Sequence, residues 1–191
     1  MRRISGICGI AFPLVGLSVI LAVISRATWF SWTEYDISVL GVEGSATVFF
    51  NLGLIFTGLL GVVFLTGLSK NLVSNRIGKL GLLSLLLGSV GISGTGLFPR
   101  SGGVPHDIAS VGGYVFMVLA LVLIGFAAMR NRRMMVGVSC VLGGVITIVI
   151  LTVPWPWSGG AIEQVLACIP WASWTIMFGV RLLVNARPIE I

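Results

Sequence analysis

Apolar side chains form long uninterrupted runs along this chain, and short polar segments separate the runs. A helix needs roughly 20 apolar residues to cross a bilayer core about 30 Å thick. Six runs of about this length cover residues 4–24, 46–68, 80–98, 108–129, 134–153 and 164–184. Strands of a membrane barrel would instead alternate apolar and polar residues. The pattern therefore predicts an all-α integral membrane protein, a single domain over residues 1–191 with six transmembrane helices arranged as three hairpins.

The composition supports a membrane environment. Hydrophobic residues make up 57% of the chain and charged residues 9%, and the mean hydropathy is +1.08. A soluble domain has about 25% charged residues, and a chain of this size cannot bury so much apolar surface in its own core. A soluble enzyme and a disordered chain are both excluded. Membrane lipids are the expected partners, and the oligomeric state stays open.

Lysine and arginine residues predict the orientation. Ten of the twelve fall on one side of the predicted bilayer, and only Arg26 and Arg100 fall on the other. The ten are Arg2, Arg3, Lys70, Arg76, Lys79, Arg130, Arg132, Arg133, Arg181 and Arg187. Basic residues concentrate in cytoplasmic loops, so we expect both termini to be cytoplasmic in a cell-membrane protein. The net charge of +6 then reflects topology, and no nucleic-acid partner is expected.

The acidic residues and the single histidine gather on the opposite, outer side. Only Glu190, in the C-terminal tail, is on the inner side; the outer groups are Glu34, Asp36, Glu43, His106, Asp107 and Glu163. The first outer loop, residues 25–45, is the longest connection and carries Trp29, Trp32 and Tyr35. Tryptophan and tyrosine favour the headgroup level of a membrane. We expect this loop to fold back over the bundle as a cap.

Two outer loops share a sequence pattern. Pro99, Ser101, Gly102 and Gly103 recur 57 residues later as Pro156, Ser158, Gly159 and Gly160, which sets Glu163 opposite His106 and Arg187 opposite Arg130. One interpretation is a duplicated hairpin, in which residues 80–129 superpose on 137–186. The alternative is that proline and glycine recur at turns for local reasons. In either case we expect the glycines to permit a sharp chain reversal.

A candidate site follows from the polar groups near the outer ends of the second to fourth spans. Asn51 lies inside an apolar run, and an amide without a partner in hydrocarbon is costly. We expect Asp36, Ser38, Asn51 and His106 to converge there, with Glu43, Arg100, Asp107 and Glu163 around them. Arg100 would neutralise one carboxylate and leave the pocket net acidic.

Metal and cofactor chemistry are weakly indicated. His106, Asp107, Asp36 and Glu163 offer the nitrogen and oxygen ligands of a divalent ion, but CxxC, HxxxH and HExxH spacings are absent. Cys8, Cys140 and Cys168 all lie in apolar runs, as small buried residues do. No dinucleotide or phosphate loop occurs, and no cofactor is identified.

Four features occur in order along the chain: residues 36–42 (DISVLGV), 49–54 (FFNLGL) and 96–99 (GLFP), followed by His106. Together they resemble a prokaryotic membrane family catalogued as domain of unknown function 998. The resemblance covers nearly the whole chain and implies a six-helix bundle with no settled activity. It also favours one shared site for Ser38, Asn51 and His106.

Three functions remain open at this point. The first is a protein whose outward-facing polar pocket binds or transports a lipid headgroup, a small solute or a cation. The second is a membrane-embedded hydrolase or transferase that uses His106 and carboxylates, with or without a metal. The third is an accessory or structural subunit of a membrane complex.

Overall fold

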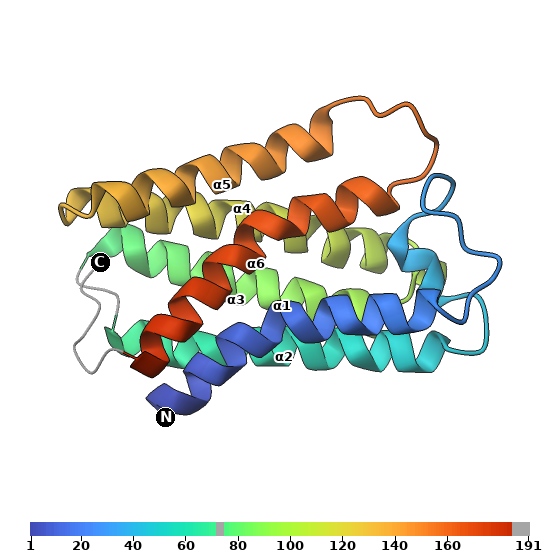
Figure 1. The fold of residues 1–191 in the computed structure, drawn as a ribbon, viewed down its shortest axis with the longest axis horizontal. Helices are drawn as coiled ribbons and strands as arrows, with labels where there is room; N and C mark the ends of the chain where they lie inside the picture. The colour runs from blue at the N-terminus through green and yellow to red at the C-terminus, as the bar shows by residue number, and fades with distance from the viewer. Residues whose placement is uncertain (72–74, 185–191) are drawn as a thin grey trace.

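The computed structural model describes residues 1–71 and 75–184, and it is all-helical over this part of the chain (Figure 1). Each of the six long helices is long and apolar enough to cross a membrane, as the hydrophobic runs predicted. The helices are α1 Arg2–Ile24, α2 Thr47–Asn71, α3 Arg76–Leu97, α4 Val104–Arg130, α5 Met134–Thr152 and α6 Ala161–Val184; two 3-10 turns are η1 Ile37–Gly41 and η2 Arg100–Gly102.

The largest boundary differences are at the starts of α3 and α4, which begin four residues before the apolar runs at 80 and 108. In both cases the helix begins with a first turn that lies outside the apolar run. The Asn75 side chain accepts a hydrogen bond from the Gly78 backbone N–H at 2.8 Å and so caps α3. In α4, Pro105 stands in the first turn, where its missing N–H does no harm.

The six helices form a closed ring. Each one packs along the next in the chain, and α6 packs back on α1. Every helix thus packs mainly on two others, although α4 also touches α6, and the packing does not single out three separate hairpins. The N-terminus and the end of α6 lie at one end of the bundle, which we call the terminal end (Figure 1). The opposite end, with residues 25–46, 98–103 and 153–160, is called the cap end.

Glycines allow the neighbouring backbones to approach closely. A Cβ atom on Gly179 of α6 would lie 2.7 Å from the carbonyl oxygen of Gly6 on α1, near the terminal end. Similar contacts join α3 to α4 at Gly91 and Gly113, and α4 to α5 at Gly125 and Gly137. Small residues serve helix packing in membranes in this way because lipid gives no hydrophobic drive between helices.

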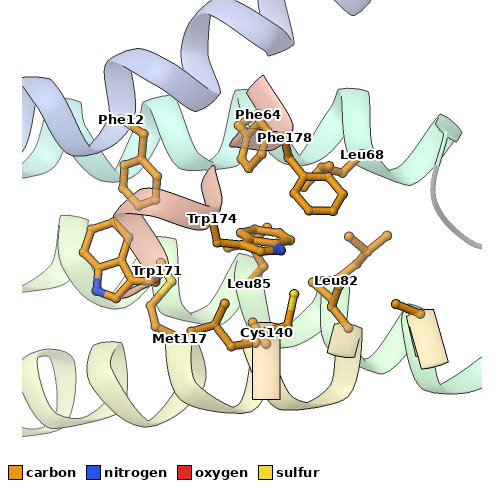
Figure 2. Packing of buried hydrophobic residues seen from close by; sticks show 14 of the residues in the cluster. Phe12, Phe64, Leu68, Leu82, Leu85, Met117, Cys140, Trp171, Trp174 and Phe178 are labelled. Carbon is orange, nitrogen blue, oxygen red and sulfur yellow. The ribbon is translucent and has the colours of Figure 1, made fainter. Parts of the chain in front are cut away.

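Aromatic side chains fill the ring from its middle to the terminal end. Phe12, Phe64, Trp171, Trp174 and Phe178 point toward one another between the helices (Figure 2). The rings of Trp174 and Phe178 are 4.7 Å apart, and those of Phe12 and Trp171 are 5.1 Å apart. This half of the bundle is therefore solidly packed.

The cap end is covered by the first loop, as expected. Ile37 and Leu40 of η1 are buried against Val23, Phe50 and Ala161 of three different helices. The loop's aromatic residues, Trp29, Phe30, Trp32 and Tyr35, stack edge to face or tilted on one another. Together these groups close the mouth of the ring.

Most of the basic side chains in the described part of the chain flank the terminal end. They are Arg2, Arg3, Arg76, Lys79, Arg130, Arg132, Arg133 and Arg181, whereas Arg26 and Arg100 lie at the cap end. Arg187 and Glu190, and the side chain of Lys70, lie outside what the structure describes. The expected cytoplasmic position of the termini stays a prediction.

The two loops of the repeat differ in structure. The helices that follow them, α4 and α6, begin at Val104 and Ala161, which keeps the 57-residue offset. However, η2 and a left-handed Gly103 (φ 64°) precede α4, and no helical turn precedes α6. Residues 185 and 186 of the proposed superposition lie beyond the described chain, so the duplication stays a prediction.

Candidate functional site

The Asp36 carboxylate is the acceptor that several polar groups at the cap end share. Its Oδ2 accepts a hydrogen bond from Arg100 in an ion pair. Its Oδ1 accepts from the Gly160 backbone N–H at 3.0 Å and from Gln164 Nε2 at 3.3 Å. We call Asp36, Arg100, Gly160 and Gln164 the polar clasp. It joins the first loop to the loop after α3 and to the start of α6.

The same segments are joined through their backbones. Thr33 and Tyr35 accept hydrogen bonds from the N–H groups of Gly159 and Ala161, at 2.9 and 3.0 Å. Gln164 Oε1 accepts from the Ile37 N–H at 2.9 Å. The first N–H groups of a helix lack intrahelical partners and favour negative charge. Tyr35 and Asp36 supply these partners to α6 from another part of the chain.

Gly159 and Gly160, which precede α6, let the first loop approach the backbone closely. A Cβ on Gly160 would overlap the Asp36 carboxylate, and one on Gly159 would overlap the Tyr35 backbone. Neither glycine has a positive φ angle, unlike Gly103. The missing side chains at this pair make room for the first loop, and the expectation that the glycines permit a sharp reversal stays a prediction.

Asp36, Ser38 and Arg100 lie together, since the Ser38 hydroxyl is 3.5 Å from Arg100 Nη1. Asn51 and His106 are bonded elsewhere, each to a backbone carbonyl. Asn51 Nδ2 donates to Gly41 at 2.9 Å and holds α2 to the end of η1. His106 is 5% exposed, and its Nδ1 lies 2.8 Å from the Phe98 oxygen. A carbonyl oxygen only accepts, so Nδ1 donates and ties α4 to the end of α3.

The remaining acidic candidates lie apart from the clasp. Glu163 accepts a hydrogen bond from Trp157 Nε1 at 2.8 Å, and Glu43 and Asp107 are exposed. Within residues 1–71 and 75–184, no three His, Cys, Asp or Glu side chains are grouped so that they could hold a metal ion. The expected ligand set of His106, Asp107, Asp36 and Glu163 thus has no support from the geometry.

A cavity of about 300 Å³ lies inside the ring, below the polar clasp. Ile37, Ser38 and Gln164 line its cap end, and Phe12, Met117 and Trp171 line its deep end. Its α6 wall runs from Gln164 to Ile176, or about 18 Å at 1.5 Å per residue. None of the lining residues is charged. The volume falls at the lower end of the ligand pockets found in proteins, about 300–1,000 Å³.

Polar side chains of the cavity wall concentrate toward its cap end. Tyr114 Oη donates to the backbone oxygen of Gln164 at 3.2 Å and lies 3.8 Å from Cys168 Sγ. Ser110, one turn earlier on α4, lines the same cavity. The structure gives its hydroxyl no hydrogen bond to any described residue, although hydroxyls of the wall such as Thr57 and Thr95 bond within their own helices.

The cavity opens sideways between α1 and α6. Leu14, Leu17 and Ile169 line it and yet are 49%, 43% and 52% exposed. The two helices meet near the terminal end, where Gly6 and Gly179 are in contact, and they diverge toward the cap end (Figure 1). In a bilayer this opening faces the hydrocarbon of one leaflet.

Sequence reasoning missed Gln164, Tyr114, Ser110 and the cavity itself. One available signal was proline within two predicted spans: Pro13 of α1 lines the cavity, and Pro170 stands in α6. An interior proline removes a backbone hydrogen bond and often bends a helix. The two prolines occur in the two helices between which the cavity opens.

Six membrane-length helices, of which all but α5 line an apolar cavity, define a multi-pass integral membrane protein. More particularly, the chain belongs to the family described as protein of unknown function (DUF998), whose model matches residues 8–181. This confirms the resemblance seen in the sequence. Neither curated proteins nor solved structures give a match to the chain.

Proposed function

We propose that this protein binds a lipid-like molecule in the cavity of the helix ring, with the cap end outside the cell membrane. The observation that carries the proposal is a 300 Å³ cavity with apolar walls that opens between α1 and α6. A molecule that enters there comes from the bilayer and not from water. The orientation rests on the arginines around the terminal end, since basic residues favour the cytoplasmic side.

A lipid fits this cavity better than a cation or a polar solute. The only ion pair among the described residues joins Arg100 to Asp36, which precedes Ile37 at the cap end of the cavity. The pocket is thus not the net acidic one expected from the sequence. A cation in the cavity would lose its hydration and find no negative side chain to compensate. A polar solute would lose hydrogen bonds to water that apolar walls do not replace.

Binding is favoured over passage across the membrane. The aromatic residues around Trp174 and Phe178 fill the ring from the deep end of the cavity toward the terminal end. A bound molecule in this conformation therefore reaches only one leaflet. The hydrolase alternative gains no support, because His106 is buried and donates to the Phe98 carbonyl, and no carboxylate of the described residues is bonded to it.

The test is lipid occupancy in a pair of α4 variants. Ser110→Phe places a large ring in the cavity, whereas Val111→Phe, at a 62% exposed neighbouring position, faces outward. After purification with limited delipidation, bound lipid is extracted and quantified by mass spectrometry. We expect about one tightly held molecule per chain in the wild type and in Val111→Phe, and a loss of most of it in Ser110→Phe.

Thermal unfolding of the same samples distinguishes a specific loss of bound lipid from a loss of the folded structure. The proposal fails if the wild type retains no tightly held lipid. It also fails if Ser110→Phe, with an unfolding midpoint like that of Val111→Phe, retains as much lipid as the wild type.

A further inference from the structure

We infer that the cavity selects a single-chain lipid with an uncharged hydroxyl head, that is, a long-chain alcohol. This rests on the proposed function and names the chemical class of the ligand. Three features of the cavity lead to it: the charge of its wall, the hydrogen-bonding groups near its cap end, and its size and side opening.

The wall carries no charge that would pair with a charged head. Its polar members are serine, threonine, tyrosine, glutamine and cysteine side chains. Asp36 and Arg100 lie above the cavity and neutralise each other in the polar clasp. An unpaired phosphate, carboxylate or ammonium group moved from water to this site loses solvation that the wall does not replace. The wall therefore discriminates against both signs of charge.

The two hydroxyls on α4 match an alcohol. Ser110 and Tyr114 are four residues apart, which puts them on one face of the helix. The Ser110 hydroxyl has no partner among the described residues and is free to donate or accept. Tyr114 donates to the Gln164 oxygen and keeps lone pairs that accept. A ligand hydroxyl that accepts from Ser110 and donates to Tyr114 satisfies both groups at once.

The dimensions suit one chain with its head near the cap. Ser110 lies six residues into α4, or about 9 Å below the start of that helix. From there the cavity continues past Met117 and Trp171 with mostly apolar walls, in which Thr57 and Ser173 are the polar members. A 300 Å³ volume leaves little room for a second chain, and the opening at Leu17 and Ile169 lets a longer chain extend into the bilayer.

Photo-crosslinking tests this selection on the whole protein in nanodiscs. The probe is a long-chain alcohol with a diazirine in its chain, and labelled residues are mapped by mass spectrometry. Competitors of equal chain length are the plain alcohol, the alkyl sulfate and the alkyl trimethylammonium ion, whose charges do not depend on pH. We expect saturable labelling near Met117, Ile169 and Trp171, and competition by the alcohol at least tenfold stronger than by either ion.

Two serine variants distinguish the loss of the hydrogen bond to the ligand hydroxyl from nonspecific effects of a serine substitution. Ser110→Ala should weaken binding of the probe about fivefold, as for the loss of one hydrogen bond. Ser139→Ala, on an exposed position of α5 outside the cavity, should bind like the wild type. Equal competition by the ions, or no effect of Ser110→Ala, overturns the alcohol preference while the lipid cavity stands. The absence of saturable labelling at the cavity overturns the proposed function itself.

Discussion

At the scale of single residues, the position of the cap depends most on Asp36, whose carboxylate accepts hydrogen bonds from three groups on two other segments. We expect Asp36→Ala to lower the free energy of unfolding by about 1–2 kcal/mol, because it leaves Arg100 and the first turn of α6 without their acceptor. Glu43→Ala is the control: it removes an exposed carboxylate of the same cap and should change stability by less than about 0.5 kcal/mol. Thermal unfolding in detergent measures both, and equal effects would contradict the role given to the clasp.

A second prediction at this scale concerns the glycines against which the first loop packs. Gly159→Ala should destabilise the protein by about 1–3 kcal/mol, since the new Cβ overlaps the Tyr35 backbone and cannot be relieved by a side-chain rotation. At Gly112, a helical position, an added Cβ would have no atom of another segment within 4 Å. Gly112→Ala should therefore be neutral or slightly stabilising. The unfolding midpoints of the two variants are compared. If Gly159→Ala unfolds at the same temperature as the wild type, the first loop is free to move away from this position.

At the scale of elements, the crossing of α1 and α6 sets where the cavity can open. Gly179→Leu should lower stability by about 1–3 kcal/mol, because even its Cβ would lie 2.7 Å from the Gly6 carbonyl oxygen. Val180→Leu, at the adjacent 43% exposed position, should have little effect. The measurement is again the unfolding midpoint, with lipid occupancy as a second readout. If both variants behave alike, close contact at Gly6 is not what holds the two helices together.

At the scale of the whole molecule, the remaining question is the side of the membrane to which the cap belongs. Cysteine introduced at Gly102, in the loop before α4, should react with an impermeant maleimide on intact cells. Cysteine at Asn131, between α4 and α5, should react only after permeabilisation. The reason is the basic cluster around the terminal end. The opposite pattern of labelling would reverse the orientation and place the cavity in the inner leaflet.

The candidate site was only partly predictable from the sequence. Asp36, Ser38 and Arg100 lie together at one end of the bundle, where a loop between two spans has to emerge. The bonding partners of Asp36 on the start of α6, Gly160 and Gln164, come from more than 120 positions further along the chain, and no local pattern marks such a pair. The Asn51 amide did need a partner, and the Gly41 carbonyl that accepts from its Nδ2 became visible only once η1 was folded onto α2, while its Oδ1 stays buried without a partner among the described residues.

The sequence by itself determined the six helices, the membrane environment and the family. These depend on the length and polarity of contiguous segments, since a backbone in hydrocarbon has to satisfy its own hydrogen bonds and a helix does so locally. Tertiary structure alone decided that the helices close into a ring, that α1 and α6 diverge, and that a cavity with uncharged walls remains between them. Those features depend on which side chains face one another across the bundle, and in a nearly uniform apolar background that pairing leaves no periodic signal along the chain.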